Sequence, residues 1–123
     1  MSTDLQGTFN DATGFWNNAN WPALLALCHP NIIMTHVDDN KPPIVGIAAL
    51  QDYLNTKGNQ DRSRFNVTTQ SPPLEQGVNG SVRGSADFYD TSSTPTPRQI
   101  RYQFLFLRPG PGATWLLINS SGR

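Results

Sequence analysis

The sequence lacks the features that mark several classes of protein. Its 123 residues include a single cysteine, Cys28, so no internal disulfide can form. Only 15% of the residues are charged, nine basic and nine acidic, and the formal net charge is zero. The arginines and lysines form no basic stripe, so we expect no nucleic-acid partner. No apolar run approaches the roughly 18 residues of a transmembrane helix, so we expect no membrane partner.

Targeting signals and metal-ligand patterns are missing as well. The N-terminal stretch MSTDLQGTFNDATGFW has neither the basic start nor the apolar run of a signal peptide, so a cytoplasmic location is expected. Two histidines, His29 and His36, and one cysteine give no metal-ligand spacing. We therefore predict no metal and no other cofactor. The length predicts one domain over residues 1–123.

The first half of the chain carries helical periodicity. Apolar residues recur at spacings of three and four, the pattern of amphipathic helices. Three helices are predicted, over residues 4–18, 21–27 and 46–58. The β-branched run at residues 32–37 predicts a strand buried on both faces. Pro42-Pro43 then keeps the following turn irregular.

Beyond a polar linker at residues 59–64 the apolar period changes to two, which indicates strands. Asn79-Gly80 predicts a tight hairpin turn. Four strands are predicted, over residues 65–78 with a break at Pro72-Pro73, 81–89, 99–107 and 114–120. Short turns between consecutive strands favour an antiparallel sheet, and helices gathered in the first half of the chain favour packing on one face of it. The sequence therefore predicts an α+β fold with a cleft between helices and sheet.

Several stretches together resemble the nuclear transport factor 2-like superfamily, over nearly the full length. They are the aromatic pair Phe15-Trp16, the helix-to-strand step LLALCHPNIIMTHV, the segment GIAAL at 46–50 and the last strand ATWLLINSS. The resemblance implies a cystatin-like cone, in which a curved antiparallel sheet, mixed at the first strand, wraps round three N-terminal helices and a central pocket. It also implies a homodimer formed through the outer side of the sheet. Relatives include ketosteroid isomerases, polyketide cyclases and non-enzymatic modules, so the fold leaves the chemistry open.

The acidic turn holds the best catalytic candidates. In the isomerases and cyclases that the chain resembles, a carboxylate just after the first strand is the general base, and Asp38 and Asp39 occupy that place here. At the mouth of an apolar pocket a carboxylate pKa rises into a useful range, although Asp-Asp-Asn is also ordinary solvated turn chemistry. His36 is the third candidate, paired with an aspartate such as Asp87 or else hydrogen-bonded at a sheet edge or dimer contact.

Aromatic and polar residues elsewhere are candidates for the pocket wall. These candidates are Phe15, Trp16, Met34, Tyr53, Asp87, Tyr102, Phe104 and Trp115. Asp87 alternates with Arg83 and Ser85, and this polar face can equally be a solvent face. No acid lies on the strand at 100–107, where the steroid isomerases that the chain resembles would place one. That absence argues against steroid isomerisation.

Two functions remain open at this stage. One is binding of a small apolar ligand, cyclic or oxygenated, with acid/base chemistry of a lyase, isomerase or cyclase. The alternative is a non-catalytic dimerisation or protein-interaction module of the same fold. The sequence does not decide whether the chain is an enzyme.

Overall fold

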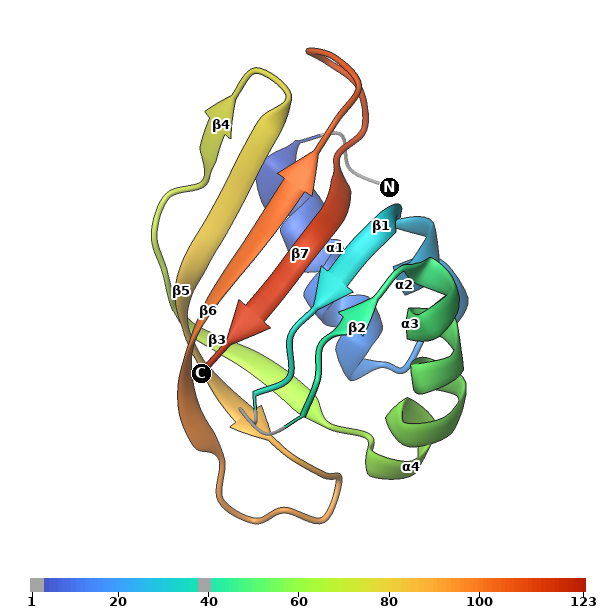
Figure 1. Cartoon of the computed structure of the whole chain (residues 1–123). Helices are drawn as coiled ribbons and strands as arrows, with labels where there is room; N and C mark the ends of the chain where they lie inside the picture. The colour runs from blue at the N-terminus through green and yellow to red at the C-terminus, as the bar shows by residue number, and fades with distance from the viewer. Residues whose placement is uncertain (1–3, 38–40) are drawn as a thin grey trace.

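A computed structural model describes residues 4–37 and 41–123 of the chain (Figure 1). Asp38 and Asp39 lie outside these residues. The helical elements are α1 (Leu5–Asn17), α2 (Trp21–Ala26), α3 (Ile47–Tyr53), the π-helical turn η1 (Leu54–Gly58) and α4 (Asn59–Asp61). The strands are β1 (Cys28–Met34), β2 (Ile44–Val45), β3 (Arg64–Gln70), β4 (Leu74–Gln76), β5 (Asn79–Tyr89), β6 (Arg98–Leu107) and β7 (Leu116–Gly122). No helix of the described part of the chain is long and apolar enough to cross a membrane.

The strands form one seven-stranded sheet in the order β2-β1-β7-β6-β5-β3, with β4 paired to the side of β5. β1 runs parallel to β7, and every other pairing is antiparallel. Figure 1 shows the curved sheet with α1 behind it and the remaining helices beside β1 and β2. The predicted fold class, an α+β cone with a sheet mixed at the first strand, is therefore confirmed.

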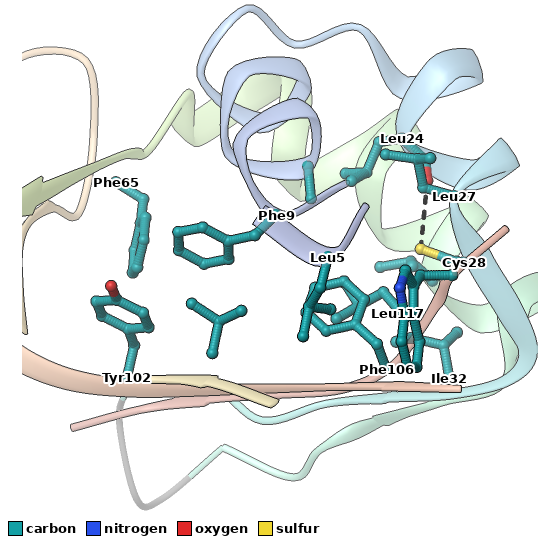
Figure 2. Packing of buried hydrophobic residues seen from close by; sticks show 14 of the residues in the cluster. Leu5, Phe9, Leu24, Leu27, Cys28, Ile32, Phe65, Tyr102, Phe106 and Leu117 are labelled. Atoms are coloured by element: carbon teal, nitrogen blue, oxygen red, sulfur yellow. Dashed lines mark hydrogen bonds between the residues drawn. The ribbon is translucent and has the colours of Figure 1, made fainter. Parts of the chain in front are cut away.

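The helices lie on one face of the sheet, which we call the inner face. Alternate residues of β5 and β6 point to it, and they are the buried ones, such as Val82, Ala86 and Ile100. On α1 the apolar stripe that includes Leu5 and Phe9 packs against this face, where the Phe9 ring stacks on Tyr102 with centroids 5.5 Å apart (Figure 2). The opposite side, which we call the outer face, carries the remaining residues of each strand.

Cys28 is part of the same core (Figure 2). Its Sγ donates to the carbonyl oxygen of Leu24 over 3.3 Å. Burial raises the pKa of the Cys28 thiol from its ordinary value of 9.0 to about 12. The thiolate form is therefore suppressed at neutral pH, and Cys28 acts as a small core residue.

The predicted helices are confirmed, but the third continues past its predicted end at residue 58. It widens into η1 and then runs on through α4, ending at Arg62 with a left-handed φ of 53°. The Trp21 Nε1–H group donates to Asn59 Oδ1 over 2.6 Å, and a Cβ at Gly58 would lie 3.3 Å from the Trp21 ring. This packing against α2 overrides the stop signal of the lysine-glycine pair.

The first strand differs from its prediction in extent and in burial. β1 begins at Cys28, so His29-Pro30 belongs to the strand, and the short strand β2, which was not predicted, pairs with its end. Ile32 is buried, whereas the next residue, Ile33, is 36% exposed. The prediction that this strand is buried on both faces is wrong, because the helices cover only the inner face of the sheet.

The hairpin before β5 turns at a different dipeptide from the predicted Asn79-Gly80. The turn is Gly77-Val78, with Gly77 at a φ of 63°, and Asn79 and Gly80 already pair with β4. Gly80 has another role: a Cβ there would lie 3.0 Å from Leu5 and 3.1 Å from Trp115. This glycine lets α1 approach the sheet closely.

Candidate functional site

A cavity of about 110 Å³ lies between the inner face of the sheet and the helices, and it opens to solvent. α1, α2 and α3 contribute to its wall, together with β1, β2, β3, β5, β6 and β7. Its aromatic lining consists of Trp16, His36, Tyr53, Phe65, Phe88 and Phe104. The cavity is therefore an apolar pocket of the kind that binds small molecules.

Phe65 and Phe104 form one wall of this cavity. Phe104 points inward from β6, and its ring centroid lies 5.6 Å from that of Phe65 on β3. The backbone of Phe65 is held by the Asn17 side chain at the end of α1. Asn17 Nδ2 donates to the Phe65 carbonyl oxygen, and the Phe65 N–H donates to Asn17 Oδ1, both over 2.8 Å. One asparagine thus joins α1 to an edge strand and sets the position of an aromatic wall residue.

His36 and Tyr53 are the two titratable side chains of the described lining. His36 follows β1, Tyr53 ends α3, and their rings meet edge to face with centroids 5.3 Å apart. The pKa of the Tyr53 phenol is raised by burial and, to a smaller extent, by the negative charge of Asp61. Tyr53 therefore remains a hydrogen-bond donor at neutral pH, beside an imidazole that can carry a proton in either direction.

Ser120 is a buried polar residue of the lining that the sequence analysis did not identify. It lies on β7, is only 6% exposed, and pairs with Phe104 and Met34, both of which also line the cavity. Within residues 4–37 and 41–123 its hydroxyl makes no hydrogen bond to another protein group, whereas its carbonyl oxygen accepts from the Thr35 N–H over 2.9 Å.

A bulge explains why strand alternation could not find Ser120. Leu117 is inward-facing and pairs with Phe106, but Asn119 pairs with Leu105, so the pairing shifts by one residue at Ile118. Counting by twos from Leu117 would therefore place Ser120 on the outer face. Only the register of the β6–β7 pairing identifies Ser120 as inward-facing, and this register depends on the tertiary structure.

The structure brings several of the predicted site residues together. Trp16, Met34, His36, Tyr53 and Phe104 all line the cavity. Asp38 and Asp39 directly follow Val37, which also lines the cavity, but the two aspartates themselves lie outside the described residues. Phe15 is partly buried against the core and is not among the lining residues.

Asp87 requires a correction. It pairs with Gln99 between the inward-facing residues of β5, and its side chain is therefore on the outer face. The suggested acid–base pair between His36 and Asp87 is wrong, because the sheet separates the two side chains. The solvent-face alternative for Arg83, Ser85 and Asp87 describes this strand correctly.

Tyr102 and Trp115 are inward-facing but serve the core rather than the cavity. The Tyr102 hydroxyl donates to the Thr69 carbonyl oxygen over 3.1 Å, and burial raises the pKa of this phenol. Trp115 is fully buried, and the Arg108 guanidinium lies over its ring at 4.1 Å from the centroid. The prediction that Tyr102 and Trp115 line the cavity is therefore wrong. Buried aromatic residues of a core and those of a pocket wall follow the same sequence pattern.

Charge is absent from the described lining. No Asp, Glu, Lys or Arg of residues 4–37 and 41–123 contributes to the cavity wall. The same residues include no group of three or more His, Cys, Asp or Glu side chains that could hold a metal ion. The polar side-chain groups of the described lining are hydroxyls, the His36 imidazole and the Trp16 indole N–H, which is buried and makes no hydrogen bond within these residues.

Comparison with known proteins defines the class of the fold. No protein-family model matches the sequence. No curated protein sequence matches it either. Solved structures do: a ketosteroid isomerase-like protein from Erwinia carotovora atroseptica has a TM-score of 0.72 at 15% identity, covering 96% of this chain and 91% of its own. An NTF2-like protein of unknown function from Pseudomonas putida has a TM-score of 0.77 at 11% identity, covering 96% and 82%.

A third solved neighbour is a provisionally assigned calcium/calmodulin-dependent protein kinase II association domain from Xanthomonas campestris. Its TM-score is 0.73 at 16% identity, and the match covers 96% of this chain and 83% of that one. Another neighbour, from Novosphingobium aromaticivorans, is described as NTF2-like with a cystatin-like fold. The chain therefore has the nuclear transport factor 2-like fold, and identities this low show the fold alone.

Proposed function

We propose that the chain binds a small apolar molecule, cyclic or oxygenated, in the cavity and acts on it by proton transfer, as a lyase, isomerase or cyclase. The observation that carries this proposal is the aromatic cavity with His36 and Tyr53 in contact on its wall. Such an arrangement combines an apolar binding surface with a few convergent polar groups. The ketosteroid isomerase-like neighbour and a provisionally assigned dehydratase from Streptomyces avermitilis support it by analogy of fold.

In this proposal each polar group has a distinct role. Tyr53 donates a hydrogen bond to an oxygen of the substrate, because its phenol stays protonated. His36 moves a proton to or from the substrate, and Asp38 and Asp39 supply the general base after the first strand.

The first test is a thermal-shift screen against steroids, terpenoid epoxides, aromatic polyketides and small acids. A ligand at 100 times its dissociation constant stabilises the folded state by about 2.7 kcal/mol, which is readily measured. A hit names the compound class for turnover assays. An absence of stabilisation across the whole panel contradicts the proposal.

The two histidines provide a matched pair for the turnover assay. His36→Gln is expected to lower kcat by about two orders of magnitude or more, the usual contribution of a general acid or base. His29→Gln is the control, because His29 lies on β1 outside the cavity lining and its Nδ1 accepts from the Asn31 N–H. Equal activity of the two variants would exclude His36 from the reaction.

A second function, self-association, is favoured by a row of exposed aliphatic residues across the outer face. The pairings align Leu74, Ser81, Leu105, Asn119, Ile33 and Val45 in one line across the sheet. We call its apolar members, Leu74, Leu105, Ile33 and Val45, the outer apolar row; they are 51%, 37%, 36% and 62% exposed. We propose that a second copy of the chain covers this row to form a homodimer.

A second copy fits this surface for two reasons. A two-fold axis that runs along the row places each residue opposite the same residue of the second copy, so the apolar residues meet apolar residues. The formal net charge is zero, so two copies approach without net repulsion. The neighbour assigned as a kinase association domain supports assembly as a use of the fold by analogy.

A further inference from the structure

We propose that the cavity selects a single-ring molecule that bears one oxygen and no negative charge, and that the Ser120 hydroxyl hydrogen-bonds to that oxygen. This inference rests on the proposed ligand-binding function and specifies which ligand the same cavity takes. Three properties of the cavity carry it: its volume, its charge and the position of Ser120.

The volume limits the ligand to about one ring. At about 110 Å³ the cavity is on the scale of the roughly 150 Å³ engineered cavity that binds benzene, and it is well below the 300 Å³ or more of drug-sized pockets. A fused four-ring skeleton therefore has no room inside it. The lining rings of Trp16, Phe65 and Phe104 offer faces and edges against which one flat ring can pack.

The lining also selects against anions. Within the described residues no ammonium or guanidinium group lines the cavity, so an anionic ligand would lose its hydration without gaining an ion pair. Packing against the aromatic walls compensates for little of the lost hydration free energy. A carboxylate such as benzoate is therefore disfavoured relative to a neutral molecule of the same size.

Ser120 adds a specific polar requirement to this apolar site. The residue is 94% buried, it lies between Phe104 and Met34 on the inner face, and its hydroxyl has no protein partner among residues 4–37 and 41–123. The hydroxyl oxygen itself is not fully buried, because it borders the cavity, so a ligand oxygen there can replace water as its hydrogen-bond partner. Another hydroxyl of the lining is engaged within the protein, since Thr13 Oγ1 donates to the Asn10 carbonyl oxygen over 3.0 Å.

The test compares toluene, phenol, benzoate, 2-naphthol and a four-ring steroid by calorimetry on the wild-type chain and two variants. Ser120→Ala removes the proposed hydrogen bond. Ser121→Ala is the matched control, because Ser121 also borders the cavity but its hydroxyl donates to the Gln103 carbonyl oxygen over 3.4 Å. Ser120→Cys, which keeps a similar side-chain size with a weaker donor, serves if the alanine variant does not fold.

Phenol is expected to bind wild type about fivefold tighter than toluene, the typical gain from one net hydrogen bond. Ser120→Ala should remove this preference, Ser120→Cys should reduce it, and Ser121→Ala should keep it. Benzoate and the steroid should bind at least tenfold more weakly than phenol. The melting temperature of Ser120→Ala should not fall, because the variant loses an unpaired hydroxyl.

Opposite results separate the two proposals. Tighter binding of the steroid, 2-naphthol or benzoate than of phenol overturns the single-ring inference but leaves ligand binding intact. An unchanged phenol preference in Ser120→Ala overturns the role of Ser120. Failure of every compound in both this series and the broader screen overturns ligand binding itself.

Discussion

Gly84 occupies a position in the sheet that has no space for a side chain. A Cβ built there would lie 2.1 Å from the Thr69 carbonyl oxygen and 2.7 Å from the Tyr102 hydroxyl. Both atoms are fixed, since the hydroxyl donates to that same carbonyl. We expect Gly84→Ala to lower the free energy of unfolding by about 2–3 kcal/mol, as overpacking of a rigid site does.

Gly14 is the matched control for this prediction. It lies within α1, and a Cβ there would meet nothing within 4 Å. Gly14→Ala should therefore raise the free energy of unfolding by about 0.5–1 kcal/mol through helix propensity alone. Urea denaturation of the two variants measures both effects. Similar midpoints for the two would contradict the close approach of β3, β5 and β6 at Gly84.

Among the elements, the link between α1 and β3 depends on one asparagine. Asn17 makes two hydrogen bonds to the Phe65 backbone and takes the place of a neighbouring strand at the edge of the sheet. We expect Asn17→Ala to cost about 1–3 kcal/mol of stability, because it leaves two partly buried backbone groups without their partner. It should also weaken ligand binding, since Phe65 is part of the cavity wall.

Asn18 provides the comparison for Asn17. Its side chain is exposed and makes no hydrogen bond to any of the residues that the structure describes. Asn18→Ala should change stability by no more than about 0.5 kcal/mol. Chemical denaturation and calorimetry with a known ligand check both variants. An Asn17→Ala variant as stable as Asn18→Ala would show that β3 holds its place without the side chain.

How far the sequence predicts each element depends on the range of the interactions that shape it. Helical periodicity is local, so the positions of α1, α2 and α3 could be predicted from spacing alone. The end of α4 depends on Trp21, far away in the sequence, and Lys57-Gly58 gave no sign of it. Likewise, the contact of Gly80 with Leu5 and Trp115 exists only once α1 packs on the sheet.

At the scale of the whole molecule, the outer apolar row predicts a dimer. Val45→Glu places a charge at its most exposed member and should weaken self-association by at least tenfold, because an unpaired carboxylate is costly in an apolar interface. Val67→Glu is the control, since Val67 is 40% exposed on β3 but lies outside the row. Light scattering across a concentration series measures the effect. A wild-type chain that stays monomeric at every concentration would contradict the proposal.

Residue roles in the candidate site were harder to predict than the fold because they depend on which face of a strand each residue occupies. The α+β class follows from the order of helices and strands, whereas the cone was implied by the resemblance to the nuclear transport factor 2-like superfamily. Asp87 and Ser120 show the difficulty: one faces away from the cavity, and the other reaches it only because of the shift at Ile118. Tyr102 and Trp115 show a second difficulty, since buried aromatics look alike in sequence whether they fill a core or line a cavity.

The parallel pairing of β1 with β7 has a consequence for the order of events in folding. The two strands are far apart in the sequence, so their pairing closes a long loop and is expected late, after the β5–β6 and β6–β7 hairpins have formed. The cavity takes Met34 from one of these strands and Leu117 and Ser120 from the other, so it is completed only at that late step. A molecule bound there therefore prolongs the lifetime of the folded chain rather than speeding its formation.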